Sequence, residues 1–242
     1  MLDWFSKIIN VKVYTHDKNR SFMHATPPIA SGRMLPDWFK KLRKKVLQTN
    51  NFGVPYEQGT IRYCPAVKNY IASGFIVPVW TDVNIRINPD KTWAYQAADP
   101  IEIIEHEKEQ YQGFMEDHIH LKFLSPWFFY SKKDIDMMIL DVYYHNPNKD
   151  FSIVPGFINF KYTHNFNINM FAKVKSEPYV IKLKAHDPFV HILCPNKTIK
   201  IILSKSSIED LSPSDKFEMS KYSHRPYFNN KYGQMLRNQV KK

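Results

Sequence analysis

The sequence predicts a mainly β protein, with an antiparallel β-sandwich or jelly-roll-like core, a basic N-terminal helix and short C-terminal helices. Three observations point to this class. Eight or more short segments alternate apolar and polar residues, turn-forming residues separate them, and 43% of the 242 residues are hydrophobic. That apolar content is enough to bury a core without disulfides or metal ions.

The clearest helical pattern lies at residues 34–50. Asp37 follows a proline and can cap the start of a helix, while Phe39, Leu42 and Val46 recur at helical spacing. Lysine and arginine occupy most of the remaining positions. The pattern therefore predicts an amphipathic basic helix, which either packs on a sheet or binds nucleic acid, an acidic protein or a membrane surface.

The β pattern occupies residues 60–204, which we predict to be the sandwich core. Alternation between residues 79 and 87 is typical of a half-buried antiparallel strand. Residues 1–59 precede this core as an N-terminal segment, and residues 205–242 follow it as a C-terminal arm of short polar helices. Further strands are predicted at residues 118–124, 127–132, 136–144, 165–171, 179–184, 189–193 and 198–203.

Charge is distributed in blocks of opposite sign along the chain, whose formal net charge is +11. Residues 1–50 contain ten Lys and Arg against three Asp, and residues 213–242 contain seven basic side chains against two acidic ones. Residues 87–120 reverse the sign, with eight acidic side chains against two lysines. Such blocks favour either head-to-tail association of identical subunits or binding to nucleic acid.

No catalytic motif is recognisable in the sequence. It contains no Gly-x-Ser-x-Gly elbow and no P-loop, and its two cysteines, Cys64 and Cys194, stand apart rather than in a CxxC pair. We therefore predict a protein that is not an enzyme and binds no cofactor. His118 and His120 share one face of a predicted strand, a spacing that zinc and iron sites use, but no carboxylate follows them at metal-ligand spacing. A metal site at this pair is the alternative to an ordinary strand face.

Residues 154–164, VPGFINFKYTH, resemble the nucleotide-pocket hairpin of the dUTPase and dCTP deaminase family. In that family an aspartate stands at the position of Asn159, contacts the sugar and helps to activate water. An amide cannot accept a proton at neutral pH, so Asn159 removes this base. The resemblance covers residues 120–205 and implies a related β-fold without the catalytic groups.

Several blocks of sequence resemble a group of tailed-bacteriophage proteins of unassigned function. The blocks are PPIASGRMLPDWFKKL, TIRYCPAVKNYIASGFIVPVWTD, LKFLSPWFFY, and GFINFKYTHNFNINMF with the later KAHDPFVHILCP. Together they span residues 26–195, and the stretch from CPAV to VPVWTD is the most specific part. The chain departs from the group at SKKDID, where relatives commonly have a glycine-bearing turn. The resemblance implies a phage origin and no particular reaction.

Together these patterns predict a non-enzymatic bacteriophage protein that acts through protein–protein contacts, as a virion structural component or an assembly factor. The alternatives are an intracellular phage protein that binds a nucleotide or nucleic acid, and a protein that inhibits a host target. The residues predicted to contact partners are Trp38, Lys40, Lys41, Arg43, Lys44, Lys45, Tyr232, Met235 and Leu236.

The predicted location is the virion or the cytoplasm of the infected host. No apolar run approaches the roughly 20 residues that span a bilayer, and the N-terminus does not have the pattern of a secretion signal. Expected partners are other virion proteins or copies of the same chain, with nucleic acid at the basic helix as the alternative and no membrane.

Overall fold

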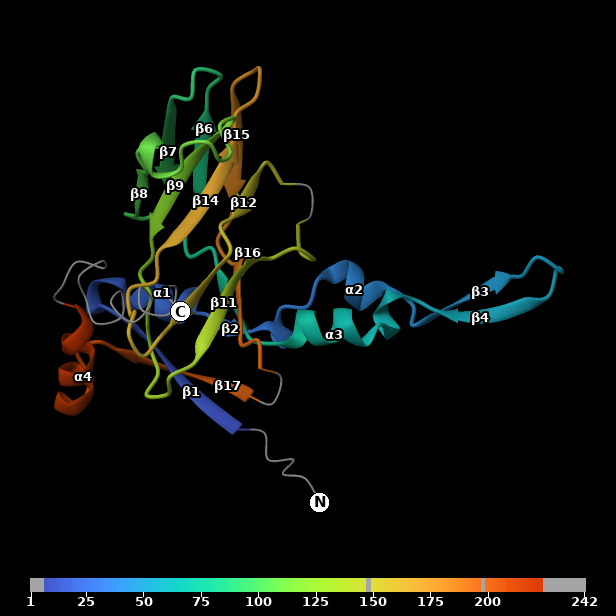
Figure 1. Ribbon diagram of the computed structural model, residues 1–242, viewed down its shortest axis with the longest axis horizontal. Helices are drawn as coiled ribbons and strands as arrows, with labels where there is room; N and C mark the ends of the chain where they lie inside the picture. Colours follow the sequence, from blue (N-terminus) through green and yellow to red (C-terminus); the bar gives the residue numbers. More distant parts are fainter. Residues whose placement is uncertain (1–6, 147–148, 197–198, 224–242) are drawn as a thin grey trace.

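The computed structural model describes residues 7–146, 149–196 and 199–223, and these residues form a mainly β protein (Figure 1). Within them, strands assemble into five sheets. β1 and β17 pair in parallel, and the other strand pairs in the described part are antiparallel. The prediction of a mainly β, antiparallel class is therefore confirmed.

Two sheets join strands from distant parts of the sequence. A three-stranded sheet contains, in order, β10 (Phe128–Tyr130), β1 (Lys7–Thr15) and β17 (Ile199–Ser207). A five-stranded sheet contains β13 (Gly156–Asn159), β11 (Asp136–Asp141), β16 (Pro188–Leu193), β5 (Phe75–Pro78) and β2 (Ile29–Ala30). The first strand of the chain thus lies between two strands from much later in the sequence.

Three further sheets are formed by strands that are mostly close in sequence. A four-stranded sheet contains β12 (Phe151–Ile153), β14 (Ile168–Lys173), β9 (His118–Leu124) and β8 (Glu102–Glu105). A three-stranded sheet contains β15 (Tyr179–Leu183), β6 (Val83–Ile87) and β7 (Trp93–Ala97). The last sheet is the hairpin of β3 (Lys45–Thr49) and β4 (Pro55–Gly59).

Short helices connect the sheets. The α-helices are α1 (Arg20–Ala25), α2 (Asp37–Lys41), α3 (Pro65–Ala72) and α4 (Pro213–Ser223). The 3₁₀ helices are η1 (Asp17–Asn19), η2 (Ser31–Arg33), η3 (Ile61–Tyr63) and η4 (Lys108–Gln110). Of the helices in the described ranges, none combines the length and the apolar character that crossing a membrane requires.

The hydrophobic core follows the alternation seen in the sequence. In β6, Val83, Ile85 and Ile87 are buried while the residues between them are exposed, and in β9 buried residues alternate with half-buried ones. Aromatic residues fill the centre: the fully buried Phe129 ring lies 4.8 Å from Phe160 between ring centroids. Such close aromatic packing accounts for the cluster in SPWFFY, which belongs to the core.

The predicted basic helix at residues 34–50 is wrong. α2 ends at Lys41, and Leu42 already has an extended backbone (φ −63°, ψ 131°). The chain then enters β3, which pairs with β4. Two physical reasons explain the difference. Lysines four residues apart, such as Lys40 and Lys44, repel each other along a helix. In addition, a helix this short depends on burial of its apolar stripe, and Val46 is exposed.

The C-terminal prediction is met in part by α4. Asp215 near its start is buried and accepts a hydrogen bond from Lys12 Nζ at 2.7 Å, which joins α4 to β1. This hydrogen bond is the main reason that the pKa of Asp215 is lowered. The rest of the predicted arm, including Tyr232, Met235 and Leu236, lies outside the described residues.

Candidate functional site

The β3–β4 hairpin extends away from the body of the molecule, beyond α2 and α3 (Figure 1). Every residue of both strands is exposed. Two strands without a covering layer are only marginally stable in water, because they bury little apolar surface. An exposed hairpin of this kind is a candidate for contact with another molecule. We call residues 40–63 the candidate interaction surface, and the basic residues 40–45 within it the root of the hairpin.

Polar contacts fix the root of the hairpin to α2. The Arg62 guanidinium donates from Nη1 to the carbonyl oxygens of Lys40 (3.0 Å) and Leu42 (2.9 Å). These carbonyls lie at the C-terminal end of α2, where a helix has no internal donors left for them. Thr60 Oγ1 donates to the carbonyl of Arg43 at 2.6 Å. The direction in which the hairpin leaves the body is therefore set by hydrogen bonds to main-chain atoms.

The tip of the hairpin is also held by hydrogen bonds. Asn50 Oδ1 accepts from the backbone N–H groups of Phe52 and Val54, both at 2.9 Å. Gly53 has a φ of +73°, a conformation that an L side chain rarely adopts. The turn holds Phe52 outward with 90% of its surface exposed. A pre-organised tip loses less conformational entropy on binding than a mobile one does.

Apolar side chains are exposed on the hairpin and beside it. β3 carries Leu47, which is 74% exposed, and Val46 on the opposite face. Tyr56 on β4 is also exposed, and its hydroxyl hydrogen bonds to Gln48 Oε1 at 3.0 Å. The exposed large apolar residues of this surface are Val46, Leu47, Phe52, Val54, Tyr56, Ile61 and Tyr63. An apolar group of this size on a projecting element is typical of a surface that contacts another protein.

The structure places the predicted lysines and arginine at the root of this surface. Lys40 Nζ lies 2.9 Å from Asp37 Oδ1, and this hydrogen bond lowers the pKa of Asp37. Lys45 Nζ lies 2.6 Å from Glu57 Oε2, and that hydrogen bond raises the pKa of Lys45. The three cations between these pairs, Lys41, Arg43 and Lys44, are exposed and form no ion pair with any described residue.

Trp38 is partly anchored to the body rather than free for a partner. Its indole Nε1 donates to the Tyr144 carbonyl at 2.7 Å, and its ring lies 5.5 Å from that of Phe39. The side chain nevertheless remains 42% exposed. Trp38 thus links α2 to the loop after β11 and presents its outer edge beside the basic root.

Sequence reasoning missed the apolar half of the surface. The signal was present: Asn-Asn-Phe-Gly at residues 50–53 separates two short runs and is typical of a hairpin turn. The helical spacing of Phe39, Leu42 and Val46 outweighed it. The basic side chains were located by composition alone, which does not depend on whether the segment is helix or strand.

His118 and His120 share a face of β9, as predicted. His118 Nδ1 lies 2.7 Å from Asp117 Oδ1. The His120 ring is stacked between His106 (centroids 4.3 Å apart) and Phe171 (4.5 Å). Burial, with the neighbouring His106 and Lys122 as smaller causes, lowers the pKa of His120 to about 4. Within the described ranges, no group of three or more His, Cys, Asp or Glu is placed to hold a metal ion.

Asn159, at the position of the aspartate in the dUTPase-like pattern, is part of a closed polar network. Asn159 is buried, and its Nδ2 donates to Asp134 Oδ1 (2.8 Å) and Asp136 Oδ1 (3.0 Å). Its Oδ1 accepts from the Lys161 N–H at 3.1 Å. The Tyr162 hydroxyl also donates to Asp134. Donors and acceptor of this amide are all engaged, which suits a structural role in the hairpin.

Asn159→Asp is expected to destabilise the protein rather than to create a catalytic base. The new carboxylate would face two others without a donor between them, which should cost about 2 kcal/mol of unfolding free energy at pH 7.5. Its pKa would be raised in the folded state, so the loss should shrink as pH falls toward 5. Urea unfolding at both pH values measures this, with the exposed Asn84→Asp on β6 as control. Equal stability of wild type and Asn159→Asp would show that the hydrogen bonds from Asn159 to Asp134 and Asp136 do not stabilise the fold.

The chain matches no protein-family model, no curated protein and no solved structure. The geometry of the surface therefore carries the functional argument.

Proposed function

We propose that this chain is a non-enzymatic bacteriophage protein that works through protein–protein contacts, as a virion component or an assembly factor. The observation that carries the proposal is the projecting β3–β4 hairpin, with Phe52 90% exposed at its tip and exposed cations at its root. The phage origin rests on the resemblance of residues 26–195 to tailed-bacteriophage proteins.

Three properties of the hairpin suit a docking element. The large apolar side chains are the kind that dominate binding energy when a partner buries them. The hydrogen-bonded tip and root reduce the entropy lost on binding. The exposed cations, Lys41, Arg43 and Lys44, can direct the approach of an acidic partner. None of these features contributes to the core of the chain itself.

We also propose that the core is a β-sandwich. The buried faces of the β15–β6–β7 sheet and of the β12–β14–β9–β8 sheet contribute to one hydrophobic cluster, which supports packing of the two sheets against each other. A jelly-roll arrangement of the strands stays a prediction.

The test of the proposed function is the protein content of purified particles of the encoding phage. A virion component should be present at a fixed copy number relative to the major capsid protein, measured by quantitative mass spectrometry. An assembly factor should be absent from mature particles but recovered with assembly intermediates. Absence from both would contradict the proposal.

Phe52→Ser is expected to reduce incorporation into particles, or recovery with intermediates, at least tenfold without changing stability. Phe52 is exposed, so its loss should change the free energy of unfolding by less than about 0.5 kcal/mol. Phe157→Ser is the matched control, because Phe157 is 65% exposed on β13 and is not part of the hairpin. Equal loss in both variants, or no loss with Phe52→Ser, would remove the role of the hairpin.

The alternative of a nucleotide-binding protein makes a separate expectation. A nucleotide at a hundred times its dissociation constant should stabilise the folded chain by about 2.7 kcal/mol. A thermal-shift series with nucleotides measures this directly. The side-chain amide of Asn159 is already hydrogen-bonded within the protein, which gives this alternative no support. We therefore expect no change in melting temperature with any nucleotide.

A further inference from the structure

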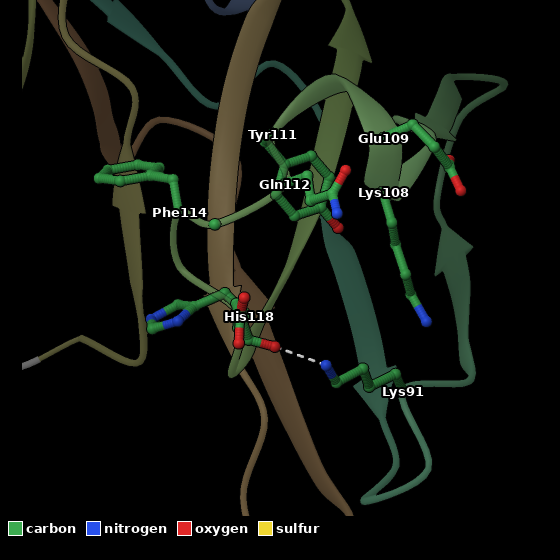
Figure 2. A pocket seen from close by; sticks show the side chains of 9 residues that line it. Lys91, Lys108, Glu109, Tyr111, Gln112, Phe114 and His118 are labelled. Carbon is green, nitrogen blue, oxygen red and sulfur yellow. Dashed lines mark hydrogen bonds between the residues drawn. The ribbon is translucent and has the colours of Figure 1, made fainter.

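A hollow on the opposite side of the molecule from the hairpin has the features of a receptor for one large side chain. Its volume is about 330 Å³, at the small end of the range for ligand pockets. Figure 2 shows Phe114 and His118 on one side of it and Lys108 and Glu109 on the other, with Tyr111 between them. The hollow lies between η4 and β9, within the acidic block of the sequence.

Aromatic packing beneath the hollow holds its walls in place. The Tyr111 ring lies 5.4 Å from His120 and 5.5 Å from Phe171, and the Phe114 ring lies 5.6 Å from Phe171. His120 in turn is stacked between Phe171 and His106. Phe114 nevertheless remains 60% exposed.

Charges around the hollow are arranged in two zones. The lining itself is balanced, with Lys91 and Lys108 against Glu109 and Glu116. The neighbouring stretch along β8 is strongly acidic: residues 99–107 contain no Lys or Arg, and its four acidic side chains are exposed. They are Asp99, Glu102, Glu105 and Glu107.

The hairpin has the complementary arrangement. Residues 46–56, which include the whole tip, carry no charge, and the root carries the exposed Lys41, Arg43 and Lys44. An uncharged tip suits the balanced hollow, and a basic root suits the acidic stretch beside it. In Figure 1, β8 and β9, which lie beside the hollow, are at the upper left and the hairpin extends to the far right, so the tip of one chain cannot reach its own hollow.

We propose that the hairpin tip of one copy inserts Phe52 into the Tyr111–Phe114 hollow of a second copy, while the basic root contacts the acidic stretch along β8. This inference rests on the proposed function and names its partner as another copy of the chain. The contact joins two different surfaces, so it is head-to-tail, and its repetition gives a ring or a filament.

Complementation between two variants tests this contact. Phe52→Asp disables the tip and leaves the hollow intact, whereas Phe114→Asp disables the hollow and leaves the tip intact. Both side chains are mostly exposed, so both variants should keep the wild-type melting temperature. Sedimentation velocity of the full chain, over a concentration series, should show oligomers for wild type and at least tenfold weaker association for each variant alone.

A mixture of the two variants should form dimers that do not grow further, because only one intact tip and one intact hollow remain to meet. High salt should weaken the association, since it screens the contact between root and acidic stretch. A mixture that stays monomeric while wild type assembles would overturn the inference, as would a Phe114→Asp chain that assembles like wild type.

The inference and the proposed function fail in different ways. If wild type is monomeric at high concentration while Phe52→Ser still reduces incorporation into particles, the hairpin binds another protein and only the inference is overturned. If Phe52→Ser has no effect on incorporation either, the role of the hairpin in the proposed function is overturned as well.

Discussion

Gly74→Ala is expected to lower the free energy of unfolding by more than about 3 kcal/mol, a large part of the total stability of a typical domain. Gly74 connects α3 to β5 and has a φ of +70°. A Cβ atom there would lie 2.0 Å from the Ile192 carbonyl oxygen and 2.8 Å from the Leu193 Cα. Both atoms belong to β16, which is bonded to β5 and β11 on its two sides and cannot easily move.

Gly113→Ala separates the two causes of this loss, which are the strained backbone conformation and the clash of the new Cβ atom with β16. Gly113 has a φ of +79°, but a Cβ atom there would meet nothing within 4 Å. Its replacement should therefore cost only the backbone strain, about 1–2 kcal/mol. Urea unfolding of both variants, followed by tryptophan fluorescence, gives the comparison. Equal losses would show that β16 yields to the new methyl group.

β6 and β9 were predictable because each carries its own evidence. In β6 buried residues alternate with exposed ones and in β9 with half-buried ones, so the period of two identifies both the strand and its inward face. How strands from distant parts of the chain pair was not predictable in the same way. The register of β1 with β17 joins residues about 190 apart, and nothing in either segment alone specifies that partner.

The segment after Lys41 shows where periodicity misleads. The apolar spacing of residues 39, 42 and 46 is compatible with a helix, but a helix forms only if tertiary contacts bury that stripe. In the structure Phe39 is buried and Val46 is exposed. The segment instead gains its order from Thr60 and Arg62, whose contacts lie about 20 residues away in sequence.

The candidate surface was accessible to sequence reasoning through charge but not through shape. The basic cluster at residues 40–45 is visible in composition. The exposure of Phe52 is not visible, because an aromatic residue is usually buried and only the projection of the hairpin from the body leaves it in water. The hollow beside Tyr111 likewise depends on stacking of His106, His120 and Phe171, which come from three separate segments.

Mild acid is expected to destabilise the protein, because several histidines are held neutral by burial. Desolvation is the main cause that lowers the pKa of His120 and of His145 to about 4, from an ordinary value of 6.5. It also lowers the pKa of His164 and His191. The unfolded chain then binds more protons than the folded one between pH 6.5 and 4. The stability that these groups contribute is present above pH 6.5 and is lost as pH falls through that window.

Lowering pH from 7.5 to 5.5 should therefore remove about 1 kcal/mol through each of His120 and His145. This range lies above the ordinary pKa of Asp and Glu, so the histidines dominate the loss. His120→Phe should keep the stack between His106 and Phe171 and abolish its share of the pH dependence. For a chain of this size that share is about 2–4 °C in the melting temperature.

His24→Phe is the matched control, because it makes the same replacement at an exposed histidine on α1. Thermal unfolding of wild type and both variants at several pH values between 7.5 and 5.5 gives the three slopes. If His120→Phe and wild type have the same slope, His120 accepts its proton in the folded state without opening the stack. The aromatic stack beside Tyr111 would then accommodate a protonated His120, which its burial should disfavour.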